Sequence, residues 1–525
     1  MTRPGFVLET DRRTPPLLVH AGEGFRLERL PPGTRVIYPP DPLPGIRDLD
    51  TAIRRALLHP HGIAPLPELL RPGMRLTIVF DDLSLPLPPM RRPDIRQRVI
   101  EHVLELAARA GVDDVELVAA NALHRRMTPA ELRHVVGDRV FRSFFPRHLR
   151  NHDAEDQANL VHLGNTKAHE RVEVNRRAAE SDLVVYVNIT LAAMNGGAKS
   201  VAVGLSSYRS LRHHHNVHTL RHSRSFNDPG NSAMHHSYER MHDVIGGHVT
   251  VFTVETTVNN QSFPDHLDFL TKREWEWSLA DRGAYLAARR GIAALPAGLR
   301  RRAFHRTRAP YGITGIHAGA PSAVHPLTLR NLHRQQVTHV EGQADIALFG
   351  IPYICPYNVD SVMNPVLVMS MGLGYLFNQY LNRPIVREGG VAIFHHPMPR
   401  EFHPVHHPSY LDFFEDVLSA TTDPEVIEAK YEEQYATDPW YTHLYRTSYA
   451  YHGVHPLYMW YWGAHAMRHL GDVIFVGADR TTAARLGFRA ASTLADALEL
   501  ASHTVGNSPR ISYLHTPPAT LAAVT

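Results

Sequence analysis

Four stretches in the first half of the chain are nearly unbroken runs of apolar and β-branched residues. They lie at 76–80, 115–120, 182–189 and 248–258. Continuous runs of this kind are typical of strands that are buried on both faces of a parallel sheet. Shorter strands are expected at 6–8 and 36–38, within a proline-rich beginning. The pattern therefore predicts a buried sheet in this half of the chain.

Helical spacing of apolar positions separates these runs. It extends from Asp94 to Ala110, where Gly111 ends it, and a further helix is expected at 48–58. Thr128 and Glu131 have the three-residue spacing of a capping box, in which each side chain binds the backbone N–H of the other residue. Strand, helix and strand in alternation predict a parallel sheet with helices on both faces.

The second half repeats this alternation. Strands are expected at 345–351, 391–396, 472–478 and 510–514, and helices at 362–373, 410–419, 424–435 and 493–502. Between the two series, residues 264–312 are arginine-rich and helical without a clear strand. We therefore expect an α/β protein of two α/β lobes with mainly parallel sheets and an active-site cleft between them. The expected domains are an N-terminal catalytic domain at 1–262, a helical insertion at 263–312 and a C-terminal domain at 313–525.

Composition narrows the possible functions. The chain has 525 residues, more than one core usually holds, and its 55 basic and 52 acidic residues give a net charge of only +3. This balance argues against a dedicated nucleic-acid surface. Cys355 is the single cysteine, which excludes an intramolecular disulfide and a thiolate zinc cage. Without an apolar signal core or a membrane-length apolar run, we expect a cytoplasmic protein with no membrane partner.

Two polar segments follow strands of the expected sheet. Asp81 and Asp82 come directly after the strand at 76–80, and His124 follows the strand at 115–120. Ligands usually bind at the carboxyl ends of parallel strands. A carboxylate there can orient a histidine, and a neutral imidazole can act as a general base near pH 7. The alternatives are a polar strand end and a loop histidine without a role.

A glycine turn and a histidine run come next. Gly196 and Gly197 allow the backbone to approach a ligand closely, and Lys199 follows in the segment GGAKS, which is not a Walker A loop. Lysine in such a loop can hold a phosphate or bond covalently to a cofactor. Histidines then stand at 213, 214, 215 and 218, and a second His-Pro run lies at 395–408. Imidazole suits nickel, copper and zinc, but both runs could also be ordinary loops.

Together these segments resemble the nickel-dependent lactate racemase family. The matching segments, in family order, are DLSLP at 82–86, ALHRRM at 122–127, GGAK at 196–199, GLSSYRSLRHHH at 204–215 and GNSAMHHSYERM at 230–241. A looser likeness continues through GGVAIFHH at 389–396 to RISYL. The resemblance covers about residues 70–262 and 313–520, with 264–312 as an addition. Each motif is short, and it is their common order that is specific.

The resemblance implies roles for individual residues. In the family, a pincer made from nicotinic acid mononucleotide holds a nickel ion. The pincer is tethered to the lysine of G-G-x-K, and a histidine of the protein completes the nickel coordination. The resemblance assigns the tether to Lys199 and the nickel ligand to His215, which lies sixteen residues further along the chain. His124 matches a family base that removes the hydroxyl proton of a 2-hydroxy acid while hydride moves to the cofactor. Asp82 matches the carboxylate of the family's D-x-x-R-P loop.

Three departures set this chain apart. The family arginine that pairs with the substrate carboxylate aligns with Leu85, the second catalytic histidine with Ile189, and a later lysine roughly with Asn364. A leucine cannot replace a bidentate guanidinium–carboxylate pair, and two bases on opposite faces suit racemisation. We therefore expect that lactate itself is not the substrate.

Three functions remain open. The first is a racemase or epimerase that uses the nickel-pincer nucleotide on a larger or less acidic 2-hydroxy compound, with this small molecule as its partner. The second is a diverged metal- or ligand-binding homologue without racemase turnover, which the loss of polar groups at Leu85 and Ile189 favours. The third is a different metal hydrolase or lyase that uses the histidine-rich loops. The oligomeric state does not follow from the sequence.

Overall fold

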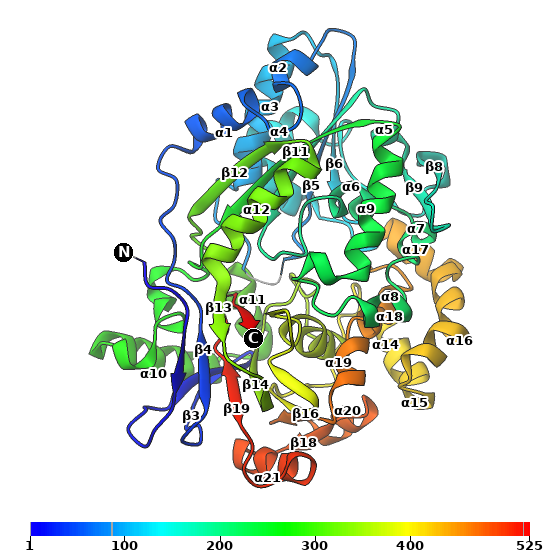
Figure 1. Cartoon of the computed structure of the whole chain (residues 1–525). Coiled ribbons are helices and arrows are strands. Elements are labelled where there is room, and N and C mark those ends of the chain that lie inside the picture. Colours follow the sequence, from blue (N-terminus) through cyan, green and yellow to red (C-terminus); the bar gives the residue numbers. More distant parts are fainter. Residues whose placement is uncertain (1, 86–87, 518) are drawn as a thin grey trace.

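Two mainly parallel sheets form the centres of two lobes. The computed structural model describes residues 2–85, 88–517 and 519–525. In Figure 1 the first sheet lies in the upper half of the molecule and the second in the lower half. The expected α/β class with two mostly parallel sheets is therefore confirmed.

The first sheet has six strands in the order β12-β11-β10-β5-β6-β7. All neighbours pair parallel except β12, which runs antiparallel to β11. Their bounds are β5 Arg75–Asp81, β6 Asp114–Ala120, β7 Leu149–Asn151, β10 Leu183–Thr190, β11 Thr250–Val258 and β12 Ile313–Gly319. The four long runs of the sequence thus become adjacent parallel strands, and their carboxyl ends share one edge of the sheet.

Helices cover both faces of this sheet, and β10 shows why. Leu183, Val185 and Val187 pack in one core, with the helices α1 (Leu49–Leu58), α3 (Ile95–Arg109) and α4 (Pro129–Phe144). Val184 and Tyr186, which point the other way, pack in a second core with α6 (Lys199–Gly204) and α9 (Ala233–Gly246). Every residue of β10 is buried, as expected for a strand with helices on both sides.

The second sheet runs in the order β1-β4-β19-β14-β16-β17-β18. Its strands are β1 Phe6–Glu9, β4 Arg35–Tyr38, β14 Ala344–Pro352, β16 Val386–His395, β17 Asp472–Val476, β18 Arg489–Ala491 and β19 Ile511–Leu514. Only the β1–β4 pair is antiparallel, and a hairpin of β2 (Leu17–Gly22) and β3 (Phe25–Glu28) extends the end of β14. The helix α21 (Leu494–Val505) packs on one face; α13 (Pro365–Met369), α18 (His455–Tyr461) and α19 (Ala464–His469) pack on the other.

The chain crosses between the lobes more often than the expected boundaries at 262 and 313 imply. The strands of residues 6–38 belong to the second sheet, because β4 pairs with β19. Conversely, β12 lies beyond the helical insertion but completes the first sheet beside β11. The first sheet therefore comes from one stretch of chain, 75–319, whereas the second is built from two, 6–38 and 344–514. The N-terminus accordingly lies midway along the molecule, at the left of Figure 1.

The segment expected to be helical contains α10 (Leu279–Ala294) and α11 (Ala297–Arg306), and Ser278 and Asp281 form a capping box at the start of α10. The capping box of Thr128 and Glu131 also forms, at the start of α4. The helix expected at 362–373 begins at Pro365 and continues as a π-helix over Ser370–Leu376.

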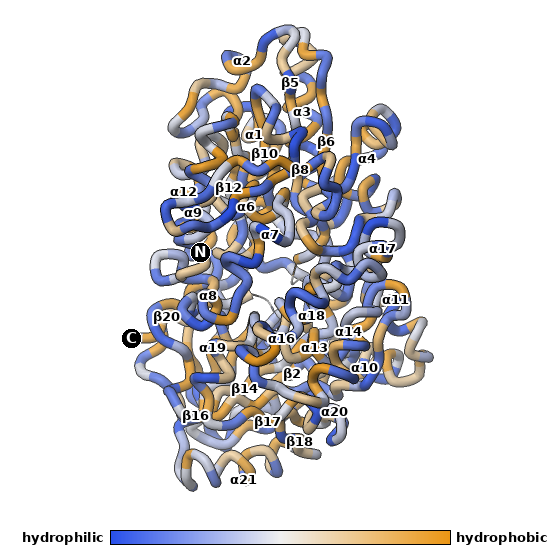
Figure 2. Tube along the Cα trace, turned by 90° about the vertical axis from the view of Figure 1, so that its right-hand side faces the viewer, coloured by the Kyte–Doolittle hydropathy of each residue, from blue (hydrophilic) through white to orange (hydrophobic). Residues whose placement is uncertain are grey.

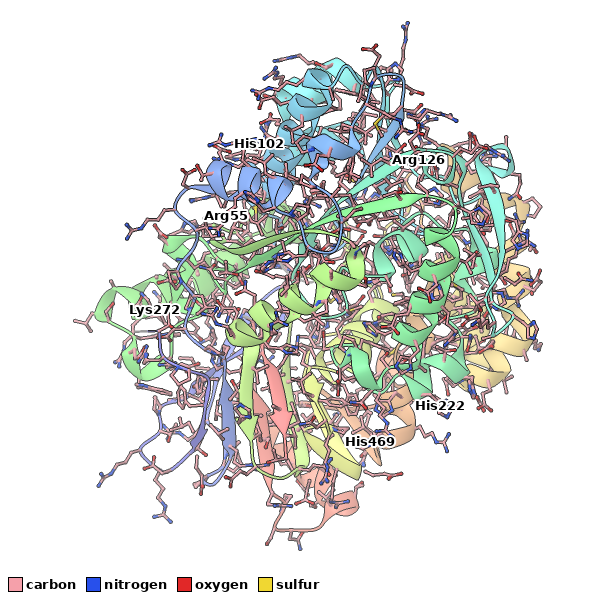
Figure 3. The ribbon with its side chains drawn as sticks, turned by 45° about the horizontal axis from the view of Figure 1, so that its top comes forward. Arg55, His102, Arg126, His222, Lys272 and His469 are labelled. Carbon is pink, nitrogen blue, oxygen red and sulfur yellow. The ribbon has the colours of Figure 1, made fainter. Side chains whose placement is uncertain are left out.

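Hydropathy and charge follow these layers. Figure 2 shows orange stretches along β10 and β14 in the interior, whereas α17 (Pro439–Thr447) at the outside is mostly blue. Arg55 and His102, labelled in Figure 3, belong to the helices α1 and α3 that cover the first sheet. Among the described residues, no helix has the length and apolar character required to span a bilayer.

Candidate active site

A cavity of about 110 Å³ lies where the two lobes meet. Asp82, His124, Gly196, Lys199 and His215 line it from the first lobe. The second lobe contributes Pro356, Tyr357, Tyr375 and Trp462. Five of the six site residues expected from the sequence therefore share one cavity. The sixth, Gly197, adjoins this lining without being part of it.

Asp82 and His124 form a hydrogen-bonded pair at one wall. They follow β5 and β6, which are parallel neighbours, so the carboxyl ends of these strands bring the two side chains together. His124 Nδ1 lies 2.8 Å from Asp82 Oδ2, and Ser84 donates to the same carboxylate from its backbone N–H and its hydroxyl. Burial raises the pKa of Asp82, but His124 and Ser84 outweigh it and leave this pKa below its ordinary value. The carboxylate can therefore hold the ring and leave Nε2 free.

The buried side chain of Arg96 fixes the loop that carries Asp82. Arg96, near the beginning of α3, donates from one nitrogen to the backbone carbonyls of both Asp81 and Asp82, at 2.7 and 2.8 Å. Its other nitrogens bind Asp94, so the buried charge is paired. Asp81 accepts hydrogen bonds from Tyr186, Asn188 and the backbone N–H of Ile189. Burial nevertheless raises the pKa of Asp81 to about 6.

The glycine turn requires glycine at both positions. Gly196 has φ +88° and Gly197 φ +59°. A Cβ on Gly196 would lie 2.8 Å from the Glu255 carboxylate, and one on Gly197 would lie 2.8 Å from the ring of His325. Glu255 Oε1 accepts a hydrogen bond of 2.6 Å from the Gly197 N–H, and His325 Nδ1 lies 3.1 Å from Oε2. The turn thus packs against a buried carboxylate.

Lys199 stands directly after this turn, at the start of α6. Burial lowers the pKa of its amine to about 8, although Asp81 and Asp82 act in the opposite direction. No hydrogen bond to this amine is found within the described ranges. An amine with a lowered pKa is a better nucleophile near neutral pH, because more of it is unprotonated.

His215 reaches the same cavity from the loop after α7 (Tyr208–Leu211). Its ring stacks on Trp462 with centroids 5.4 Å apart, and its Nδ1 lies 2.7 Å from Nδ1 of His214. Burial and the charges of Lys199 and His124 lower the pKa of His215 to about 3. The imidazole is therefore neutral at physiological pH, as a metal ligand must be.

The remaining histidines of this run point elsewhere. His214 is buried against Tyr238, and the ring of His218 contacts that of His222 at a tilted angle at the surface, where Figure 3 labels His222. The described residues hold no group of three or more His, Cys, Asp or Glu side chains that could bind a metal ion. This also applies to the His-Pro run at 395–408.

Comparisons with known proteins find similar sequences for the first part of the chain. A model of the lactate racemase N-terminal domain matches residues 24–228. Curated lactate racemases of Lactiplantibacillus plantarum and Thermoanaerobacterium thermosaccharolyticum are 25% and 24% identical over 169 residues. These matches span 31% of this chain and only 37% of each relative.

Structural similarity extends much further along the chain. The lactate racemase apoprotein from T. thermosaccharolyticum has a TM-score of 0.62 at 15% identity, over 97% of this chain and 99% of that chain. This likeness shows that the chain has the fold of that protein, while the sequence match to the lactate racemase N-terminal domain covers residues 24–228, less than half of the chain. A Thermotoga maritima protein solved by a structural genomics consortium has a TM-score of 0.51 at 14% identity, covering 92% of this chain and all of the other, and supports the fold alone.

The three departures from the lactate racemase pattern have different structural settings. Leu85 lines the cavity, so an apolar side chain occupies the place expected for the carboxylate-binding arginine. Ile189 lies in the core of the first lobe. Asn364 accepts a hydrogen bond from the Leu367 N–H as the N-cap of α13, which is a structural role. Pro86, the last residue of the DLSLP segment, lies outside the described residues.

Sequence reasoning missed the second lobe's share of the site. Tyr357 and Tyr375 place their hydroxyl oxygens 2.9 Å apart, and burial raises the pKa of both. Tyr357 follows β14, so the same strand-end argument that selected His124 could have found it. Tyr375 and Trp462 lie on helical segments, where nothing in the sequence marks which aromatic side chain reaches the cavity.

Proposed function

We propose that the protein is a racemase or epimerase that uses a nickel-pincer nucleotide to invert a hydroxyl-bearing carbon of a small molecule. One observation carries this proposal: the amine of Lys199, the neutral imidazole of His215 and the Asp82–His124 pair line the same cavity. The match of residues 24–228 to the lactate racemase N-terminal domain adds support, because the resemblance assigns the tether, the nickel ligand and the base to these positions.

The residues present fit such a cofactor. The described part of the chain has no cluster of three or more metal-binding side chains around the neutral imidazole of His215. A single imidazole suits a metal whose other ligands come from the cofactor itself. Lys199 offers an amine with a pKa of about 8 for the tether. Small-molecule pockets usually measure about 300–1,000 Å³, whereas this cavity has about 110 Å³. We therefore expect its walls to move apart when the cofactor attaches.

The chain's own side chains would bind and orient the substrate. The cofactor would supply a centre that takes up a hydride from the substrate carbon and returns it. His124 would accept the hydroxyl proton at Nε2, and Asp82 would stabilise the resulting imidazolium through Nδ1. Within the Tyr357–Tyr375 pair one hydroxyl donates to the other, and the remaining O–H would donate a hydrogen bond to a substrate oxygen, because raised pKa values keep both phenols protonated.

The lining of the cavity also suggests the substrate. Among the described lining residues, Lys199 is the only lysine or arginine, and the tether would use it. Instead of a second cationic side chain, Leu85 and Trp462 give the cavity apolar surface. A carboxylate buried without a partner is costly. The proposed substrate is therefore a hydroxy compound that is larger or less acidic than lactate.

A ligand-binding homologue without turnover is the second candidate. Among the described lining residues, His124 is the only histidine besides the expected nickel ligand His215. Racemisation is suited by two bases on opposite faces of the substrate, so a single base favours this second candidate. The two candidates share the tether and differ in turnover.

Intact-mass spectrometry with nickel analysis tests the tether that both candidates share, and an activity assay then separates the two. The protein is co-expressed with enzymes that make the cofactor, and we expect a covalent adduct on Lys199 with one bound nickel. Lys199→Ala should lose both the adduct and the nickel, whereas His124→Ala should keep both. Chiral chromatography with a panel of hydroxy acids and uncharged hydroxy compounds then tests for turnover, which His124→Ala should lack. An unmodified Lys199 under these conditions would rule out the proposal.

A further inference from the structure

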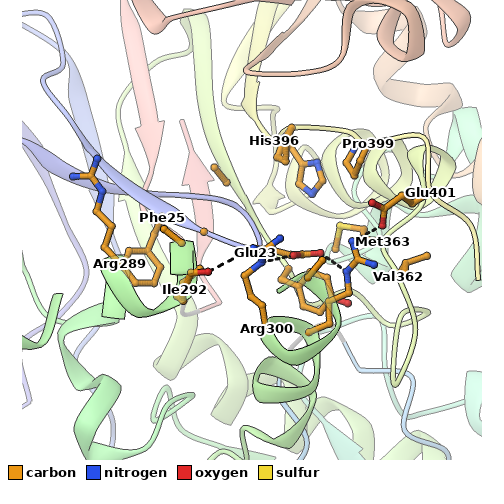
Figure 4. Close-up of a pocket in the computed structure, with 17 residues that line it drawn as sticks. Glu23, Phe25, Arg289, Ile292, Arg300, Val362, Met363, His396, Pro399 and Glu401 are labelled. Atoms are coloured by element: carbon orange, nitrogen blue, oxygen red, sulfur yellow. Dashed lines mark hydrogen bonds and ion pairs between the residues drawn. The ribbon is translucent and has the colours of Figure 1, made fainter. Parts of the chain in front are cut away.

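A second and larger cavity lies beside the helical insertion, away from the catalytic residues. Its volume is about 450 Å³, within the range of small-molecule sites. It is enclosed by α10 and α11, by the β2–β3 turn, and by the segments 353–363 and 396–401 (Figure 4). We call it the insertion cavity. The sequence segment with no assigned function thus forms one wall of a ligand-sized space.

Its walls are mainly apolar. Phe25 from β3 and Ile292 from α10 face it on one side, and Val362, Met363 and Pro399 face it on the other (Figure 4). Removing apolar surface from water stabilises a complex by about 25 cal/mol per Å². A ligand that fits these walls therefore carries an aromatic ring or a branched hydrocarbon group.

The charges that line the insertion cavity do not cancel. Glu23 pairs with both Arg300 and Arg301, and Arg301 also pairs with Glu401, so these four side chains are neutral together. Arg289 remains, and its guanidinium has no hydrogen bond or ion pair within the described part of the chain. Arg289 is exposed, and Figure 4 places it beyond Phe25, at the outer edge of the cavity, with its guanidinium directed outward. This single unbalanced positive charge selects an anionic group.

One short segment connects this cavity to the catalytic one. Tyr353 and Met363 line the insertion cavity, whereas Pro356 and Tyr357 line the catalytic cavity. The segment is cross-linked internally, because the Tyr353 hydroxyl donates 2.6 Å to the Ser361 carbonyl. His305 of α11 lies 2.9 Å from the same carbonyl. The segment that positions Tyr357 is therefore in direct contact with α11.

We propose that the insertion cavity binds a small amphipathic monoanion, an aromatic or branched carboxylate, and that binding is transmitted to the catalytic cavity through residues 353–363. The apolar walls hold the hydrocarbon part, and Arg289 pairs with the carboxylate. This binding does not depend on nickel or on a tethered cofactor, so it can be tested separately from the proposed reaction.

Fluorescence titration tests the site with 1-anilinonaphthalene-8-sulfonate, an aromatic monoanion whose emission rises in apolar surroundings. We expect saturable binding to the full-length protein. 3-Phenylpropionate should displace the probe at about one tenth of the concentration needed for 3-phenylpropanol, which has the same shape without the charge. Equal displacement by the acid and the alcohol would overturn the charge assignment.

Matched variants locate the binding. Ala293→Trp, at the cavity wall, should weaken probe binding at least tenfold, whereas Ala287→Trp, on the same helix outside the lining, should leave it unchanged. Arg289→Ala should abolish the preference for the acid, and its exposed neighbour Arg290→Ala should keep it. Hydrogen exchange should slow in 353–363 when 3-phenylpropionate binds. Unchanged binding by Ala293→Trp overturns the site, and unchanged exchange in 353–363 overturns the coupling.

Discussion

The pairing of Asp82 with His124 depends on a third residue that never reaches the cavity. Arg96 holds the backbone carbonyls of Asp81 and Asp82, so the carboxylate meets the ring at a fixed position. A hydrogen bond at Nδ1 determines which nitrogen of a histidine is free to act. The orientation of the proposed base is therefore set by the loop, and a single carboxylate determines its tautomer.

Asp82→Asn tests this control. The variant keeps the shape of the side chain but replaces an acceptor-only carboxylate by an amide. We expect His124 to lose its preference for a proton on Nδ1, which imidazole ¹⁵N chemical shifts measure. Turnover should fall by about 10²–10⁴-fold, the usual contribution of acid–base catalysis, while the nickel content stays constant. An unchanged tautomer would show that Asp82 does not orient the ring.

The reactivity of the Lys199 amine should depend on pH. Its pKa of about 8 means that the neutral amine increases as the pH rises from 7 to 9. The rate of reductive methylation at Lys199 should therefore rise through pH 8 and level off above it. The chain has four lysines, and peptide mapping separates them. Lys272 is an internal control, because Asp281 and Asp268 raise its pKa and its rate should keep rising.

At the scale of elements, the glycine turn before α6 allows no side chain. Gly197→Ala places a Cβ at φ +59°, against the ring of His325. We expect the free energy of unfolding to fall by about 2 kcal/mol, from backbone strain and the forced displacement. Urea denaturation measures this, with Gly230→Ala as the control, since a Cβ there would meet nothing within 4 Å. Equal midpoints for the two variants would contradict the argument.

Elements with strong local patterns were predictable from the sequence. The expected strands form as β5, β6, β10 and β11, and the capping box forms at Thr128. Both kinds of feature depend on residues that are close together in the sequence. The π-helical continuation at Ser370–Leu376 was not, since its pattern resembles an ordinary helix. For the site, strand ends located Asp82 and His124. Trp462 could not be located, because its role depends on how the two lobes pack.

For the whole molecule, the first strands of the chain hold the second lobe together. Leu17, Val19, Val36 and Tyr38 are buried in a core with β14, β16 and β19. Each such side chain contributes about 1.5–3 kcal/mol, so the four together approach the total stability of a typical domain. Their strands lie at the opposite end of the sequence from most of the sheet that they complete.

Deleting residues 2–38 should therefore unfold the second lobe, although most strands of that lobe lie within 344–514. We expect limited proteolysis to cut first within 345–525, and the thermal unfolding of the second lobe to shift to a lower temperature than in the full chain. Deleting only residues 2–4 removes no strand and should leave that temperature unchanged. Cooperative unfolding of the longer deletion at an unchanged temperature would mean that these strands are dispensable.

Cys355 lies within the segment that separates the two cavities, and it is the only sulfhydryl of the protein. Burial raises its pKa to about 12, so alkylation has to wait until the segment exposes it. With no other cysteine to compete, the mass added by iodoacetamide over time counts those exposures directly. The native chain thus carries an intrinsic reporter, which requires no engineered label, for how often the segment 353–363 exposes its buried thiol.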